Sequence, residues 1–215
     1  MTTYPVGLAR DLPNGRVMRA GVDGVDMVVW RDSRGTLAAW GNRCPHRGMR
    51  LSHGFVRGDR LACLYHGWQY DASGQCRYIP AHPDLNPPES IRTVSYHAAE
   101  TGGVIWVSLS EGPEPPEMPA DFEPLRTVFV TASEAAVTAA ASRTGLEGPP
   151  AKETAPGVFD IARRRIILFC NPAGPERTEV HSLIEPGASS EEKRLASRWC
   201  EAVRRTAEAS ERAAA

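Results

Sequence analysis

The sequence predicts an all-β N-terminal module, an antiparallel sandwich or barrel, followed by a small α+β segment that ends in a long helix. In the first half of the chain, short apolar stretches alternate with turns rich in Gly, Asp and Ser, which is typical of antiparallel β-structure. Near the C-terminus, Leu195, Trp199 and Val203 recur at four-residue spacing among charged residues, which predicts an amphipathic helix. The predicted organisation is a first domain at 1–110, a Pro-rich linker at 111–120 and a second domain at 121–215.

Hairpins account for most of the first domain. Residues 25–30 and 36–40 are apolar runs on either side of Asp32-Ser33-Arg34-Gly35, and this pattern predicts a β-hairpin. Further short strands are expected within 55–62 and at 69–71, 75–78, 94–97 and 104–109.

The sequence predicts both strands and helices in the second segment. Strands are expected at 128–131, 165–170 and 178–185, a short helix at 133–142 with Ser133 as its N-cap, a loop at 145–157 and a turn at 171–175. Ser189-Ser190-Glu191-Glu192 has the pattern of a capping box and begins the C-terminal helix. We expect this helix to pack on its own domain, and a subunit contact is the alternative.

Two short loops carry the residues with metal chemistry. Cys44-Pro45-His46 is followed after sixteen residues by Cys63-Leu64-Tyr65-His66, so each loop offers one thiolate and one imidazole. In a Rieske [2Fe–2S] centre, two Cys hold one iron and two His hold the other. We therefore expect Cys44 and Cys63 to bind one iron, and His46 and His66 to bind the second.

A structural zinc site is the alternative for these four residues, because two Cys and two His also bind zinc. Zinc fingers, however, usually pair Cys with Cys and His with His along the chain. This sequence alternates Cys-His and Cys-His, so the order of the residues favours the iron–sulfur centre.

The sequences CPHRG (44–48), CLYHGW (63–68) and YDASG (70–74) closely resemble the N-terminal domain of Rieske non-haem iron oxygenase α subunits, and the resemblance covers roughly residues 4–109. It implies an all-β Rieske module with cluster-binding loops and a Rieske-type [2Fe–2S] cofactor. Beyond it, the chain looks like a shortened version of the end of an oxygenase catalytic domain.

The resemblance also implies a branch within the Rieske family. Respiratory members carry an extra Cys in each loop and a hydroxyl two residues after the last His. Here Met49, Tyr65 and Trp68 stand at those positions. Fewer hydrogen bonds to sulfur imply a reduction potential at the lower end of the Rieske range.

The oxygenases also bind a mononuclear iron through two His and one carboxylate. After residue 112 this chain has one histidine, His181, which we expect to be a half-buried structural residue of a strand. Outside the four expected ligands, His53, His82 and His97 lie in or beside the first domain and are not spaced as a ligand pair. We therefore predict no catalytic residues in this chain and no mononuclear iron site of its own.

Composition sets broader limits. The formal net charge of −1 gives no electrostatic case for nucleic acid or an anionic membrane as a partner, and no apolar run is long enough to span a bilayer. The N-terminus lacks the pattern of a signal peptide. Three further cysteines, Cys76, Cys170 and Cys200, are expected to be reduced thiols, which predicts a cytoplasmic protein.

The leading hypothesis is an oxidoreductase component that transfers single electrons in a Rieske oxygenase system, with a reductase, an oxygenase subunit or both as partners. A second hypothesis is an oxygenase subunit that hydroxylates or demethylates a small organic substrate at an iron site completed by a partner chain. A third is a redox-responsive interaction module. The sequence leaves homo- and hetero-oligomers open.

Overall fold

The computed structural model describes residues 3–110, 115–118, 121–145, 150–155, 157–161, 164–174 and 176–214. The chain forms two compact units. The N-terminal unit comprises Met1–Tyr4, Ala9–Glu100 and Ile105–Pro116, and the C-terminal unit comprises Pro5–Leu8, Thr101–Val104 and Glu117–Ala215. The domain boundaries at 110 and 121 stay a prediction, and positions 111–114 and 119–120 of the expected linker lie outside the described residues.

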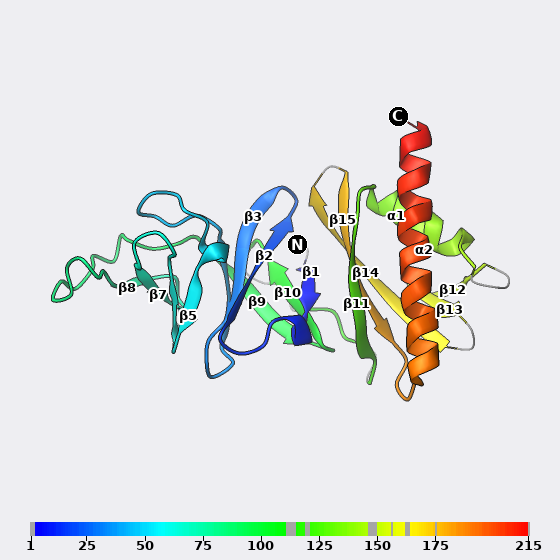
Figure 1. Cartoon of the computed structure of the whole chain (residues 1–215), viewed down its shortest axis with the longest axis horizontal. Helices are drawn as coiled ribbons and strands as arrows, with labels where there is room; N and C mark the ends of the chain where they lie inside the picture. Colours follow the sequence, from blue (N-terminus) through cyan, green and yellow to red (C-terminus); the bar gives the residue numbers. More distant parts are fainter. Residues whose placement is uncertain are drawn as a thin grey trace. The chain divides into compact units, whose positions relative to one another are not determined.

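Ten short strands precede residue 110 in the described part of the chain, and Figure 1 shows them in blue to green. They are β1 (Thr3–Leu8), β2 (Arg16–Val22), β3 (Val25–Arg31), β4 (Leu37–Gly41), β5 (Phe55–Arg57), β6 (Arg60–Ala62), β7 (Gln69–Asp71), β8 (Cys76–Tyr78), β9 (Ser95–Thr101) and β10 (Val104–Ser108), with 3-10 turns η1 (Ala9–Asp11) and η2 (Leu51–His53).

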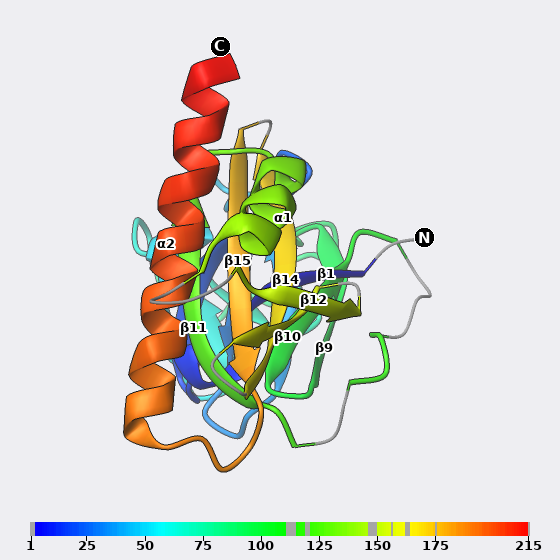
Figure 2. The ribbon, with the colours of Figure 1, turned by 90° about the vertical axis from the view of Figure 1, so that its right-hand side faces the viewer.

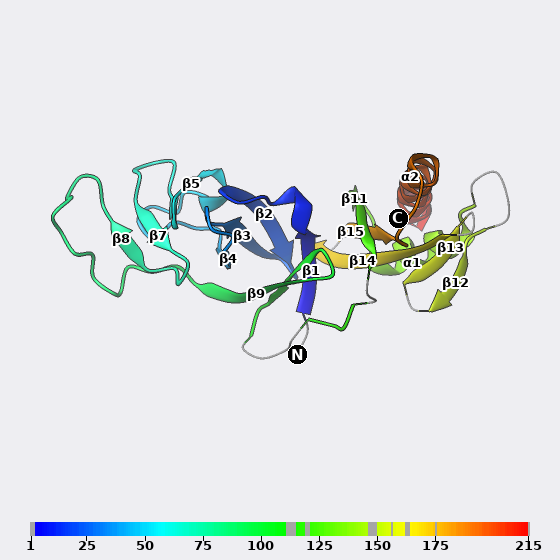
Figure 3. The ribbon, with the colours of Figure 1, turned by 90° about the horizontal axis from the view of Figure 1, so that it is seen from below.

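These strands form two sheets. The six-stranded sheet has the order β1-β10-β9-β4-β3-β2, and the four-stranded sheet runs β5-β6-β7-β8 (Figure 3). The core packs one face of β3 and β4 against residues of β6, β7 and β8. At its centre the rings of Trp30 and Trp40 lie 5.1 Å apart, and Trp40 lies 6.3 Å from Tyr70. The predicted antiparallel sandwich is confirmed.

The C-terminal unit contains a five-stranded antiparallel sheet with the order β11-β15-β14-β13-β12. Its elements are β11 (Glu123–Val130), α1 (Glu134–Arg143), β12 (Lys152–Ala155), β13 (Val158–Ile161), β14 (Arg164–Gly174), β15 (Arg177–Ile184) and α2 (Ser190–Ala214). Both helices pack on one face of this sheet through a shared apolar core. Figure 2 shows α2 running along the sheet with α1 beside it, and Figure 3 views α2 nearly along its axis.

The predicted long C-terminal helix is confirmed, including its capping box. The Ser189 amide donates to the Glu192 carboxylate (2.7 Å), and the Glu192 amide donates to the Ser189 hydroxyl (3.2 Å). Trp199 is fully buried, and its indole N–H donates to the carbonyl of Thr144 (2.9 Å). Helix α2 therefore packs on its own sheet, as expected.

Three expectations for this unit were wrong in detail. The buried face of α2 includes Ala196, Cys200 and Ala207 besides the predicted Trp199 and Val203, whereas the predicted Leu195 is only half-buried. Positions 146–149 and 156 of the expected loop at 145–157 lie outside the described residues, and its described part contains strand β12, whose exposed residues pair with β13. The expected turn at 171–175 instead continues β14 to Gly174, with a register shift after Pro172.

Neither helix in the described part of the chain combines the length and the apolar character needed to cross a membrane.

Candidate metal centre

The two predicted metal-binding loops have the same backbone hydrogen bonds. One loop, Cys44 to Met49, follows β4, and the other, Cys63 to Trp68, connects β6 to β7. In each, the cysteine amide donates to the carbonyl five residues later, at 2.8 Å for Met49 and 2.9 Å for Trp68. In each, the amide of the following glycine donates back to the cysteine carbonyl, at 2.8 and 2.9 Å. The two loops are therefore equivalent turns on different strands.

Glycine is required at the fifth position of both turns. Gly48 and Gly67 have φ angles of 71° and 68°, a left-handed conformation that costs other residues free energy. The cysteine occupies the first position of both turns. The histidine is third in the first loop and fourth in the second. The two imidazoles therefore project from different positions of two turns with equivalent backbones.

The thiols lie inside the protein. Cys44 and Cys63 are 3% and 2% exposed and belong to the apolar core of the N-terminal unit. Burial raises the pKa of the Cys63 thiol, and the nearby Cys44 thiol acts in the same direction. Backbone N–H groups of Tyr65 and His66 hydrogen-bond to Cys63 and act in the opposite direction. The second loop thus supplies donors that stabilise a thiolate.

The imidazoles lie outside the thiols. The rings of His46 and His66 are 4.6 Å apart at an interplanar angle of 63°, and His46 is half-buried whereas His66 is exposed. Burial lowers the pKa of His46, with smaller contributions from the charges of His66 and Arg47. A neutral imidazole is the form that binds a metal ion.

A tyrosine contacts one of these thiols. The hydroxyl of Tyr70, a fully buried residue of β7, lies 3.2 Å from the sulfur of Cys44. Burial raises the pKa of Tyr70, so the phenol keeps its proton and can donate to a thiolate. We did not predict this contact. The alternation along β7, which places Tyr70 on the buried side between two outer residues, is the signal that could have found it.

A proline packs against the second loop. If Gly67 had a Cβ atom, that atom would lie 3.0 Å from the side chain of Pro80. Pro80 is the second residue after β8, in a segment for which the sequence predicts no role at the metal centre. The Pro80 side chain therefore packs against the turn that carries Cys63 and His66.

A polar network holds the first loop. Asn42 is fully buried two residues before Cys44. Its side-chain amide donates to Asp26 on β3 (3.1 Å) and to the hydroxyl of Ser52 (2.9 Å), and its side-chain carbonyl accepts from the Ser52 amide (2.8 Å). These bonds fix both the entry to this loop and its exit.

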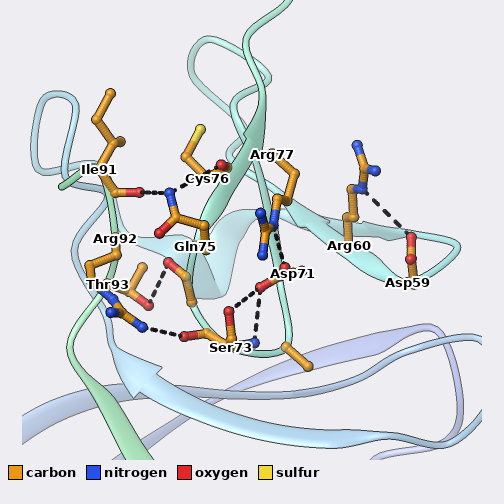
Figure 4. A network of polar contacts seen from close by, with 12 residues as sticks. Asp59, Arg60, Asp71, Ser73, Gln75, Cys76, Arg77, Ile91, Arg92 and Thr93 are labelled. Carbon is orange, nitrogen blue, oxygen red and sulfur yellow. Dashed lines mark hydrogen bonds and ion pairs between the residues drawn. The ribbon is translucent and has the colours of Figure 1, made fainter. Parts of the chain in front are cut away.

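A second network holds the segment that contains Pro80 (Figure 4). Buried Gln75 donates from its side-chain amide to the carbonyls of Pro88 (3.0 Å) and Ile91 (3.3 Å). On the same hairpin, Arg77 of β8 pairs with Asp71 of β7 at 2.5 Å. The hairpin and the segment from Pro80 to Ile91 are thus fastened together.

The other histidines and cysteines are not among the four expected ligands. His53, His82 and His97 are exposed, and His181 is 1% exposed rather than half-buried, with Nδ1 2.9 Å from the Thr127 hydroxyl. Its tight burial follows from its position on β15, the central partner of β11 and β14. Among the remaining cysteines, Cys76 belongs to the same apolar core as Cys44 and Cys63, whereas Cys170 and Cys200 pack in the core of the C-terminal unit.

Comparisons with known proteins identify the N-terminal part of the chain. The family model of the Rieske [2Fe-2S] domain matches residues 2–94. Oxidoreductase NdmD of Pseudomonas putida is 42% identical over 114 residues, which are 53% of this chain and 19% of NdmD. The 5,5'-dehydrodivanillate O-demethylase oxygenase subunit of a Sphingobium species is 32% identical over 126 residues, which are 56% of this chain and 29% of that protein.

A solved structure, apo dicamba monooxygenase, superposes with a TM-score of 0.76 over 98% of this chain and 86% of that one. At 17% identity this likeness is one of fold. The two sequence relatives are matched over less than a third of their length.

The residues present fit the Rieske cofactor. In the described part of the chain, no three His, Cys, Asp or Glu side chains are grouped as ligands of one metal ion. A [2Fe–2S] centre needs only two protein ligands for each iron, and the loops bring together two inner thiols and two outer imidazoles. Residues 2–94 therefore form a Rieske [2Fe-2S] domain of the kind found in Rieske oxygenases, and its cofactor is a Rieske-type [2Fe–2S] cluster.

Proposed function

We propose that this chain transfers single electrons within a Rieske oxygenase-type system, through a cluster held by Cys44, His46, Cys63 and His66. The observation that carries the proposal is the pair of equivalent turns, which place two thiols in the core and two imidazoles at its outer side. When bound, the cluster accepts and returns one electron at a time.

Each loop has a defined part in this assignment. Cys44 and Cys63 hold the inner iron as thiolates, since the Tyr70 hydroxyl and the backbone amides of the second loop can donate to their sulfur atoms. His46 and His66 hold the outer iron. The surrounding β-sandwich keeps both loops fixed, so little rearrangement accompanies a change of charge.

His66 marks the side where electrons enter and leave. It is exposed, and the two residues before it, Leu64 and Tyr65, are exposed by 56% and 54%. Large apolar side chains next to an exposed ligand favour contact with a partner protein. By analogy with the relatives, one of which is named an oxygenase subunit, the partners we propose are a reductase, an oxygenase subunit or both.

The second candidate is an oxygenase subunit whose mononuclear iron site is completed by a partner chain. The fold likeness to dicamba monooxygenase favours it, because that likeness covers 98% of this chain and so includes the C-terminal unit. The described residues contain no group of three ligands for a single ion, so another chain would have to complete the site.

Iron stoichiometry separates these candidates. We expect two irons and two acid-labile sulfides per chain, and no O₂ consumption when the purified protein is reduced. A third iron with O₂ consumption and an oxidised organic product would support the oxygenase subunit instead. Absence of iron and sulfide from protein purified anaerobically would contradict both.

Matched variants test the four ligands. Replacing His46 or His66 by Ala should abolish the Rieske absorption spectrum, whereas His53→Ala should keep it, because His53 is exposed outside both turns. Cys44→Ser and Cys63→Ser should likewise abolish it. Cys76→Ser is the control for these, since Cys76 is buried to a similar extent, at 1% exposed. Retention of the spectrum in the ligand variants would overturn the assignment.

A further inference from the structure

The first loop's histidine is stacked on an aromatic residue of the second loop. The ring centroids of His46 and Trp68 are 4.2 Å apart, and the ring planes differ by 6°. Parallel stacking at this distance favours one orientation of the imidazole. The contact joins two loops that are otherwise separated along the chain by strands β5 and β6.

Trp68 is itself held on two sides. Its carbonyl accepts the amide of Cys63 at 2.9 Å, which closes the second turn. Its half-buried indole also packs against the apolar core that contains Cys44 and Cys63. The face that His46 contacts is therefore fixed to the backbone of the other loop.

The equivalent position and the other histidine are different. In the first turn, Met49 occupies the position that Trp68 has in the second, and its flexible side chain offers no flat ring. His66 contacts a ring of its own loop, that of Tyr65, at 3.8 Å and 30°. Tyr65 is 54% exposed, so it is a less fixed support than Trp68.

We propose that Trp68 is a positioning residue of the metal centre, whose indole clamps the imidazole of His46 and fixes the orientation in which that histidine binds iron. This inference rests on the proposed role of His46 as a ligand. The clamp also makes the two histidines unequal, because His46 is held from the opposite loop and His66 is not.

Pulsed EPR of the reduced, cluster-loaded full chain tests the clamp, because it measures separate nitrogen couplings for the two histidines. Trp68→Met gives the second loop the residue that the first loop has. We expect it to change one nitrogen coupling and to leave the other as in the wild type. Cluster loss to an iron chelator should accelerate by roughly two- to thirteenfold, the range set by losing one aromatic pair.

Two variants serve as controls, one that keeps a ring at position 68 and one that removes the ring of Tyr65. Trp68→Phe keeps a flat ring and should restore both nitrogen couplings, whereas Tyr65→Leu should leave the His46 coupling unchanged. If Trp68→Met binds no cluster, Trp68→Phe must bind one with two couplings, and its failure to do so would overturn the proposal.

Other outcomes separate the clamp from the ligand assignment. Unchanged couplings in Trp68→Met, or equal changes in both, would overturn the clamp and leave the ligands in place. A wild-type protein without two histidine nitrogen couplings would overturn the ligand assignment itself.

Discussion

The two metal-binding loops have equivalent backbones and different side-chain environments. Both close with the same pair of hydrogen bonds and the same left-handed glycine. Yet the first presents a half-buried histidine stacked on Trp68, and the second an exposed histidine next to exposed Tyr65. The turn thus determines the backbone positions from which the ligand side chains project. The packing around each turn determines which histidine is fixed and which is accessible.

The residues that flank the two loops meet through the backbone at Gly54, and a substitution there should have the largest effect. A Cβ at this position would lie 2.3 Å from the carbonyl of Ala62, which precedes the second loop, and 2.9 Å from that of Leu51, which follows the first. We expect Gly54→Ala to lower the free energy of unfolding by roughly 3 kcal/mol, measured by urea denaturation. Gly41→Ala is the control, because its Cβ would meet nothing closer than 3.8 Å; equal stability of the two variants would contradict this packing.

The buried His181 contrasts with the two outer loop histidines and should make the C-terminal unit sensitive to pH. Burial lowers its pKa to about 4. Below pH 6.5 the unfolded chain therefore binds a proton at His181 that the folded chain does not bind. The contribution of this residue to the free energy of unfolding is full above pH 6.5 and is lost as the pH falls toward 4. The loss should reach about 2–3 kcal/mol, measured as lower amide protection factors in β11 and β15, that is, as exchange rates divided by the intrinsic rates at each pH. His181→Gln should remove this pH dependence, and its persistence would show that other groups cause it.

The glycines of the two loops should differ in their tolerance of a side chain. Alanine at Gly48 or Gly67 should cost about 1–2 kcal/mol from the left-handed backbone alone. The change at Gly67 should cost about 1 kcal/mol more, because its Cβ would meet Pro80 at 3.0 Å, whereas that of Gly48 meets nothing within 4 Å. Thermal unfolding of the two variants measures the difference, and an equal loss would show that Pro80 does not support the second loop.

The Tyr70 hydroxyl should act on one loop only, through the sulfur of Cys44. A hydrogen bond to a ligand sulfur stabilises the more negative, reduced state. Tyr70→Phe should therefore lower the reduction potential by about 40 mV, which corresponds to ~1 kcal/mol for one electron. Redox titration followed by circular dichroism measures it, with Tyr78→Phe as the control. An unchanged potential would mean that the hydroxyl does not donate to the sulfur.

The sequence predicted the features that are local. The spacing of Cys44, His46, Cys63 and His66 is visible in two short stretches, and the capping box at Ser189 is a four-residue pattern that the structure reproduces. The contacts made across the fold were not predicted. The stack of His46 on Trp68 and the Tyr70 hydroxyl on Cys44 depend on how strands β6 and β7 place the second loop beside the first.

The errors in the C-terminal unit have physical causes too. Strand β12 has four exposed residues without apolar alternation, and pairing with β13 makes it a strand. Pro172 suggested a turn, but a proline is tolerated in a strand next to a bulge, and the register of β14 and β15 shifts directly after it. Short-range composition cannot show which strand edge is available for pairing.

The central claim is that two equivalent turns hold one [2Fe–2S] cluster, with thiolates on one iron and imidazoles on the other. The most direct test is pulsed EPR of the reduced protein labelled with ¹⁵N in histidine alone. The account predicts couplings from two ¹⁵N nuclei of coordinated histidines, with one lost in His46→Ala and the other in His66→Ala. A spectrum without histidine nitrogen couplings, or one that both substitutions leave intact, would contradict it.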